Sequence, residues 1–272
     1  MNRIKPPTDS ADEPKIKARN VSQMGGFAKG LRVIEALGAS RSSLTIADIA
    51  RNSGLDRATA RRCVLTLVNI GYAASDGRHF QLTPRVLRLA HSFLTGRLPT
   101  LIQPSLEILA NRMQESCSAA VLDGSEIVYI ARASQHRLMG AGLHRGSRLP
   151  AFCTSMGRVL LAALPVEQSL TLLRDSERPA ITERTLTEVD QLMSELERIR
   201  VDGYAVIDQE LALGSRSMAV PIATGSGHTV AAINVGIPTL RSSLEQLRVN
   251  VLPMLVEAQA RLSQVLAQGT SV

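Results

Sequence analysis

The sequence predicts an α+β protein with two parts, an N-terminal winged helix-turn-helix and a larger C-terminal α/β sensor domain joined by a linker helix. Near the N-terminus, two short amphipathic helices meet at Ser53-Gly54-Leu55, and a strand-turn-strand pattern follows around Asp76-Gly77. Farther along, hairpin patterns occur among amphipathic helices, which indicates an antiparallel sheet with flanking helices. At 272 residues, the chain is long enough for two hydrophobic cores.

We divide the chain into four segments. Residues 1–22 are polar, with three prolines and mixed charge, and are expected to form a disordered tail. Residues 23–83 form the predicted winged helix-turn-helix, which opens with a helix over 26–38. Residues 84–98 form the linker helix, because Pro84 suits a first helical turn. Gly96 to Pro99 interrupts the helical pattern, so the second domain is placed at residues 99–272.

The second of the two short helices combines a buried stripe with a basic face. Asp56 stands at its N-cap position, and the apolar stripe consists of Ala60, Cys63, Val64, Leu67 and Val68. Small or cationic side chains on the other face suit a helix that enters the DNA major groove. The predicted DNA contacts on this helix are Arg57, Ala58, Thr59, Arg61 and Arg62.

The flanking elements complete the predicted DNA-binding unit. The first helix, residues 45–52, buries Ile46 and Ile49, and Gly54 supplies the positive φ of the turn. Asp76-Gly77 is a strong hairpin signal, so a wing follows. Further DNA contacts are predicted from Thr45, Arg78 and His79.

The charge of the chain is unevenly distributed. Residues 21–95 hold ten Lys/Arg and four Asp/Glu, a net charge of +6. Residues 96–272 hold 16 Lys/Arg and 17 Asp/Glu, a net charge of −1. A basic segment beside a neutral one is typical of a module that binds double-stranded DNA. The alternative is a structural three-helix domain whose basic face is only solvated.

Composition excludes several classes of protein. The sequence contains no apolar run of 18 residues and no secretory signal, so we expect a cytoplasmic protein without a membrane span. The three cysteines are odd in number and widely spaced, which predicts neither disulfides nor a zinc site. With no Trp and 3% aromatic residues, a stacking platform for single-stranded nucleic acid is not expected. No cofactor is predicted.

The second domain is expected to alternate helices and hairpins. A helix over 100–116 leads into a hairpin around Asp123-Gly124, and residues 135–150 are rich in loops. Two later strands, 218–222 and 229–235, are joined by Gly225-Ser226-Gly227. Further helices are predicted over residues 154–163, 165–174, 186–202 and 240–266.

Three segments of this half carry a resemblance to a known family. They are RLPAFCTSMGRVLLA at 148–162, GYAVIDQE at 203–210 and AAINV at 231–235. In this order they resemble the IclR family of bacterial transcription regulators, over essentially the whole chain after residue 22. They look most like the branch that controls the breakdown of aromatic acids such as protocatechuate and 4-hydroxybenzoate. The resemblance implies a GAF-like effector-binding domain and tetramers formed through it.

A candidate effector site follows from the residues and the resemblance together. Ser155 and Met156 open a predicted helix, whose free N–H groups attract a carboxylate; the alternative is an ordinary capped helix. The resemblance implies that this turn lines a pocket, in which leucines contact an aromatic ring and Ser or Asn orient hydroxyls. Gly236 departs from the small polar residue expected there. The other residues carried over are Leu138, Leu149, Asp208, Ser215, Ser217, Asn234 and Gly236.

An enzyme is the competing interpretation. Cys153 could act as a nucleophile with His136 or His144 as its base, but nothing in the sequence establishes that pairing. Asp208 and Glu210 have no His or Cys cluster nearby, so a metal site is not expected. Two classes remain: a transcription regulator that responds to a small carboxylate, and an enzyme or carrier whose winged helix binds protein. The first class requires promoter DNA as a partner, at least a dimer to read paired half-sites, and RNA polymerase for an activator.

Overall fold

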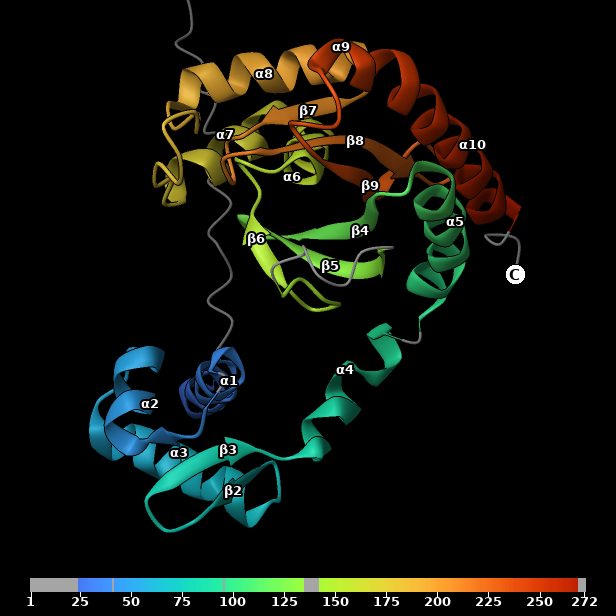
Figure 1. The fold of residues 1–272 in the computed structure, drawn as a ribbon. Coiled ribbons are helices and arrows are strands. Elements are labelled where there is room, and N and C mark those ends of the chain that lie inside the picture. The colour runs from blue at the N-terminus through green and yellow to red at the C-terminus, as the bar shows by residue number, and fades with distance from the viewer. Residues whose placement is uncertain (1–23, 41, 95, 135–141, 269–272) are drawn as a thin grey trace, which may run out of the picture. The chain divides into compact units, whose positions relative to one another are not determined.

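The computed structural model describes residues 24–40, 42–94, 96–134 and 142–268, so the expected tail lies outside the described residues. The chain divides into two compact units, Met1–Ala90 and His91–Val272. This division falls inside the segment expected to form the linker helix. Figure 1 shows the elements of each unit.

The N-terminal unit packs three helices and a small antiparallel sheet around one core. Its strands lie in the order β1-β3-β2, and Val33, Ile49 and Val64 are completely buried between the helices. The predicted winged helix-turn-helix is therefore confirmed. Its elements are α1 (Gly25–Ala39), β1 (Leu44–Thr45), α2 (Ile46–Ser53), α3 (Arg57–Asn69), β2 (Ala73–Ser75) and β3 (His79–Leu82).

Local capping sets where α2 and α3 begin and end. The hydroxyl of Thr45 and the carboxylate of Asp48 form a reciprocal capping box at the start of α2. Gly54 ends α2 with a φ of 65°, as predicted. The Asp56 carboxylate accepts the Thr59 N–H at 2.9 Å and so caps α3. Hydrogen bonding from the Thr59 side chain, together with the Thr59 N–H, lowers the pKa of Asp56.

The wing turns at the predicted position. The carboxylate of Asp76 accepts the backbone N–H groups of Arg78 at 2.9 Å and His79 at 2.7 Å, and Gly77 has a φ of 101°. Hydrogen bonding to His79 and Arg78 lowers the pKa of Asp76 to about 2. The sequence did not predict the third strand, in which Leu44 pairs with Phe80, because a two-residue strand has no visible alternation.

The first helix buries only the second half of its apolar face, which the periodicity assigns to Phe27, Leu31, Ile34 and Leu37. Leu37 is buried together with Val33, and Ile34 packs against the same core. Phe27 and Leu31 are 68% and 42% exposed. The apolar character of this face therefore extends past the part of the core that can cover it.

The region after the wing consists of two short helices before the long helix of the second unit. A 3₁₀ turn over Pro84–Val86 leads into α4 (Leu87–Leu94), and α5 begins at Arg97. The predicted break over residues 96–99 was thus too long: only Gly96 serves as the N-cap. Pro99 is tolerated because a first-turn residue needs no N–H partner within the helix.

The C-terminal unit is an antiparallel sheet with helices on both faces. The six strands lie in the order β6-β5-β4-β9-β8-β7, and Figure 1 shows α5 and α10 side by side at the sheet. Its strands are β4 (Ser116–Asp123), β5 (Glu126–Ala133), β6 (Arg148–Pro150), β7 (Ala205–Asp208), β8 (Ser215–Ala223) and β9 (Thr229–Pro238). Its main helices are α5 (Arg97–Met113), α6 (Ser155–Ala162), α7 (Val166–Asp175), α8 (Val189–Asp202) and α10 (Leu252–Gln268).

Each face of this sheet has its own core. On one face, Ile233 and Val235 of β9 pack with Leu255 of α10. On the other, Ala219 and Ala232 pack with Met156 of α6. Consecutive residues of β9 thus serve opposite cores, as the pleat of a strand requires. The sequence predicted the α+β class and most of these elements correctly.

The closing helix differs from the continuous helix expected over 240–266. Helix begins only at Leu244 in α9 (Leu244–Gln246), and a wider π-helical turn over Leu247–Val251 precedes α10. Pro253 lies just after this turn. Because Pro has no N–H to bond the carbonyl four residues earlier and its ring clashes with that carbonyl, the helix widens there.

Candidate DNA interface and effector site

The exposed side of α3 carries the predicted basic face. Arg57, Ala58, Arg61 and Arg62 are all exposed. Among the described residues, no carboxylate pairs with the three arginines. Thr59 is different: it is only 7% exposed, and its N–H is bonded to the Asp56 cap. We therefore remove Thr59 from the predicted contacts, because the residue is buried at the start of the helix instead of facing outward.

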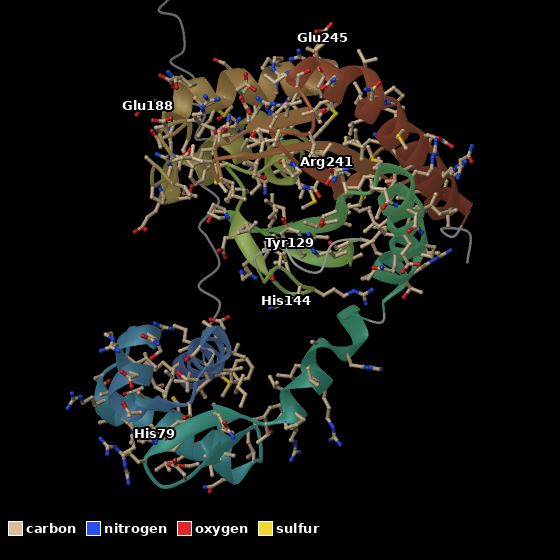
Figure 2. The ribbon with its side chains drawn as sticks, in the orientation of Figure 1. His79, Tyr129, His144, Glu188, Arg241 and Glu245 are labelled. Atoms are coloured by element: carbon tan, nitrogen blue, oxygen red, sulfur yellow. The ribbon has the colours of Figure 1, made fainter. Side chains whose placement is uncertain are left out.

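The predicted contacts outside α3 differ in accessibility. Arg78 is exposed on the wing, and the neighbouring His79, labelled in Figure 2, is 40% exposed at its side chain. The imidazole Nδ1 of His79 lies 3.2 Å from the Asp76 carboxylate. The Thr45 hydroxyl donates to the Asp48 carboxylate at 2.6 Å. Thr45 is thus used as a helix cap, whereas Arg78 remains available.

In the second unit, the sheet register aligns polar side chains in two adjacent rows. In the first row, Ser118 of β4 pairs with Arg132 of β5 and with Asn234 of β9. In the second row, Gly236 of β9 pairs with Ser116 and with Ser217. Directly paired residues project to the same face of a sheet, and so do residues two apart along a strand. We call this set the polar rows.

The polar rows lie on the same sheet face as α6. Ala219, the β8 partner of Asn234, packs in the core that contains Met156, and Leu149 of β6 borders that core. Sequence reasoning missed Arg132, Ser116 and Ser118. Alternation along β4 could have found the two serines, but the irregular pairing of β4 with β5 prevents the same argument for Arg132. The predicted effector residues on this face are Leu149, Ser155, Met156, Ser215, Ser217, Asn234 and Gly236.

Two predicted effector residues are not part of this group. Asp208 pairs with Arg216, whereas its neighbour Ile207 pairs with Ser217, so Asp208 projects to the opposite face. Its carboxylate lies 2.6 Å from Arg216 and 3.1 Å from Arg184. Burial opposes ionisation of Asp208, but hydrogen bonding and attraction from Arg216 outweigh it and lower the pKa. Leu138 lies outside the described residues.

The start of α6 is closely packed and contains an unused polar atom. Thr154 caps the helix by accepting the Gly157 N–H at 3.2 Å. A Cβ on Gly157 would lie 2.1 Å from the Ala151 carbonyl oxygen, so only glycine fits. Ser155 is fully buried, and its hydroxyl has no hydrogen-bond partner among the described residues; the same is true of the buried Asn234 Oδ1. Such orphaned atoms are rare and point to a missing partner.

A buried ion pair holds this region together. Arg158 of α6 is 1% exposed; its Nε donates to the Phe152 carbonyl at 2.8 Å, and its Nη2 donates to the Glu210 carboxylate. Glu210 also accepts the Leu186 N–H at 3.0 Å. The pair therefore ties α6 to the turn before it and to the segment before α8. Glu210 thus has two partners within the protein, Arg158 and the Leu186 N–H.

The structure does not support the enzyme interpretation. Burial raises the pKa of the Cys153 thiol to about 12, so the thiol stays protonated, and His144 is bonded to the Arg145 carbonyl at 2.8 Å. His136 lies outside the described residues. Within the described part of the chain, no three His, Cys, Asp or Glu side chains are placed to hold a metal ion, and no helix is long and apolar enough to span a membrane.

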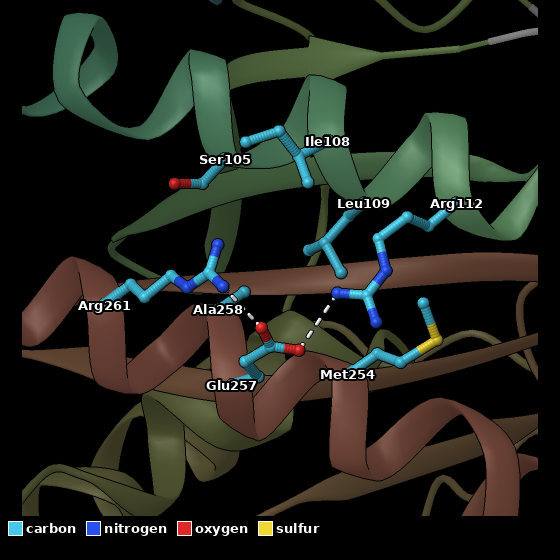
Figure 3. A pocket seen from close by; sticks show the side chains of 8 residues that line it. All are labelled: Ser105, Ile108, Leu109, Arg112, Met254, Glu257, Ala258 and Arg261. Atoms are coloured by element: carbon cyan, nitrogen blue, oxygen red, sulfur yellow. Dashed lines mark hydrogen bonds and ion pairs between the residues drawn. The ribbon is translucent and has the colours of Figure 1, made fainter.

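A separate groove lies between α5 and α10. Figure 3 shows it lined by Ile108, Arg112 and Met254. The Glu257 carboxylate lies 3.0 Å from Arg112 and 2.6 Å from Arg261. Its volume of about 20 Å³ is far below that of ligand pockets. The groove lies on the outer side of the opposite core, so we do not assign the effector to it.

Comparison with known proteins agrees with the two-unit architecture. The pattern described as "Bacterial transcriptional regulator IclR C-terminal" matches residues 96–264, and the "IclR helix-turn-helix domain" matches residues 27–77. The chain belongs to the IclR family. Members of this family are transcriptional regulators, so this protein is a DNA-binding regulator and not an enzyme.

Three relatives place the chain within the IclR family. The Pca regulon regulatory protein of Pseudomonas putida is 41% identical over 86% of this chain and 81% of its own length. The p-hydroxybenzoate hydroxylase transcriptional activator of Acinetobacter baylyi is 35% identical, and the match covers 87% of this chain and 90% of that protein. An IclR homolog from Microbacterium hydrocarbonoxydans, solved with 4-hydroxybenzoate, is 27% identical, has a TM-score of 0.72, and matches over 89% of this chain and 98% of its own.

The buried Arg158–Glu210 pair leads to a stability prediction. Replacing Glu210 with Gln leaves the Arg158 charge buried without its counter-ion, which is expected to cost about 3–5 kcal/mol of unfolding free energy. Glu257→Gln breaks ion pairs to two exposed arginines and should cost much less, because solvent screens a surface pair. Urea unfolding of both variants measures the difference. Equal losses would show that the Arg158–Glu210 pair is no more important than a surface pair.

Proposed function

We propose that this IclR-family regulator binds promoter DNA through α3 and the wing and that an aromatic acid controls this activity. The observation that carries the effector assignment is the pair of orphaned buried atoms, Ser155 Oγ and Asn234 Oδ1, on the face that holds the polar rows. A homolog solved with 4-hydroxybenzoate and relatives named for the Pca regulon and p-hydroxybenzoate hydroxylase support the same ligand class. Promoter binding implies a cytoplasmic protein, and activation would add contact with RNA polymerase.

The DNA-binding proposal rests on the accessible cations of the first unit. Arg57, Arg61 and Arg62 are exposed along one helix, and Arg78 projects from the wing. A helix presenting several arginines can hydrogen-bond guanine edges and phosphates in the major groove. In this proposal Thr45 acts as a helix cap, Thr59 is buried at the start of α3, and Ala58 allows close approach.

We expect Arg61→Ala with Arg62→Ala to weaken promoter binding strongly. Each good bidentate contact to a base is worth about 1–3 kcal/mol of discrimination, so specific binding should fall much more than non-specific binding. Lys29→Ala with Arg32→Ala is the control, because it removes the same charge from exposed positions of α1. Fluorescence anisotropy with promoter and scrambled DNA measures both. Equal losses for the two double variants would show that charge alone, and not the α3 face, drives binding.

We also propose that the protein is at least a dimer, because one α3 contacts too few base pairs for genomic specificity. The exposed leucines of α4 are the proposed contact: Leu87 is 63% exposed and Leu89 57%. Large exposed apolar side chains clustered on one helix mark an association surface. Family resemblance adds tetramers formed through the C-terminal units.

Light scattering tests this assembly. At micromolar concentration the measured mass should be at least twice the chain mass of 29.3 kDa, and Leu87→Glu with Leu89→Glu should lower it. Val201→Glu is the control, since Val201 is 80% exposed on α8 and lies outside the proposed contact. A wild-type mass of one chain, both with and without DNA, would refute the dimer.

For the effector, we expect Asn234 to distinguish ring hydroxyl patterns, aided by Ser217. The buried Asn234 Oδ1 lacks a donor, and a ligand hydroxyl would supply one. Asn234→Ala should therefore weaken the binding of 4-hydroxybenzoate by about 1–3 kcal/mol and the binding of benzoate much less. Calorimetry with both acids on wild type and variant measures this. Equal losses would contradict hydroxyl recognition, and wild-type binding of neither acid would contradict the aromatic-acid assignment while leaving the DNA-binding role intact.

A further inference from the structure

We propose that Arg132 binds the carboxylate of the effector and that the polar rows orient the ligand across the sheet from Arg132 toward Asn234. This inference rests on the proposed effector function and adds to it a residue that supplies the counter-charge. It also moves the anion site away from the start of α6, where the sequence had placed it.

Arg132 is held in position by neutral groups. It is half-buried on β5, and its Nη1 donates to the Ser118 hydroxyl at 2.9 Å, with Nη2 at 3.4 Å from Ser116. Its backbone N–H and C=O both bond the Gln103 side chain of α5. The backbone is thus anchored independently of the guanidinium, which leaves most of its five N–H donors for another acceptor.

No acid in the described part of the chain neutralises Arg132. Among the described residues it forms no ion pair with a carboxylate, and residues 135–141, which follow it closely, contain no Asp or Glu. A partly buried cation without a counter-ion is costly. By contrast, the guanidinium of Arg158, on the same side of the sheet, already donates to Glu210 and to the Phe152 carbonyl. Arg132 is therefore the arginine of the polar rows that an incoming carboxylate would neutralise.

The start of α6 is a weaker anion site than the sequence suggested. Ser155 and Met156 are 0% and 1% exposed, so a carboxylate would have to displace packed side chains to reach their N–H groups. A guanidinium also offers two parallel hydrogen bonds and a full charge, whereas a helix end offers about half a charge. The orphaned Ser155 hydroxyl then remains as a neutral partner for the ligand.

The surroundings of Arg132 determine the orientation of the acid. Tyr129 and Ala120 form the next pair on the same face; burial raises the pKa of Tyr129 to about 12, while the charge of Arg132 acts against this rise. Asn234 lies two strands from Arg132, about 10 Å away at the usual strand spacing. Its free oxygen needs a donor and would repel a carboxylate. The carboxylate therefore binds at Arg132 and a hydroxyl at Asn234.

The test compares an acid with its uncharged analogue. The wild-type protein should bind 4-hydroxybenzoate more tightly than 4-hydroxybenzamide, which keeps the ring and hydroxyl. Arg132→Met should weaken binding of the acid about 10- to 100-fold, as expected for a lost charge-assisted pair. The affinity for the amide should change by no more than about twofold. Arg148→Met is the matched control, because Arg148 lies on the neighbouring edge strand and pairs with Asp123 and Glu126 at the surface; it should change neither affinity.

Three results would overturn or replace the proposal. If Arg132→Met retains the preference for the acid, the carboxylate binds elsewhere, and if both ligands lose equally, Arg132 is only structural. If wild type binds neither compound, the aromatic-acid effector itself fails, and this proposal fails with it. Should Arg132→Met not fold, Arg132→Lys gives the same test, because it keeps the charge but loses the planar guanidinium. Binding of the acid should then weaken about tenfold, and binding of the amide should not change.

Discussion

The pairing register of the antiparallel sheet determines which side chains can meet in the effector unit. Ser118 opposes Asn234, and Cys117 opposes Val235, so polar and apolar residues of β4 and β9 separate onto opposite faces. A shift of one residue would exchange these faces and place Asn234 among the leucines and isoleucines beneath α10. Because both faces are buried against helices, such a shift would be costly, and the register is strongly specified.

A bulge in this sheet is equally important. The pairing shifts between Ala119 and Ala120, so the neighbours Ile130 and Ala131 both pack in the core beneath α5 and α10. Tyr129 and Arg132 consequently share the opposite face, although they lie three positions apart. In a regular strand they would project to opposite sides. The irregularity thus brings a phenol and a guanidinium together on the face that α6 covers.

The two units use charge differently. In the N-terminal unit, the carboxylates of Asp48, Asp56 and Asp76 cap helices and shape the wing turn, which leaves the arginines of α3 exposed and unpaired within the described residues. In the C-terminal unit, Arg158 is buried and paired with Glu210, whereas Arg132 donates to the Ser118 and Ser116 hydroxyls. Cations that no carboxylate of the described residues neutralises are open to polyanionic DNA in the first unit and to a small anion in the second.

The sequence by itself determined the winged helix, its caps, the basic face of α3, the main hairpins and the family, because these depend on periodicity and on turn residues close together in the chain. It could not decide that Thr59 is buried, that Asp208 faces away from Ser217, or that Arg132 joins Ser118 and Asn234. Those facts depend on strand register and on a bulge, which bring together residues as far as 116 positions apart (Ser118 with Asn234). Only the tertiary structure, in which helices cover both faces of one sheet, decides which side each residue faces.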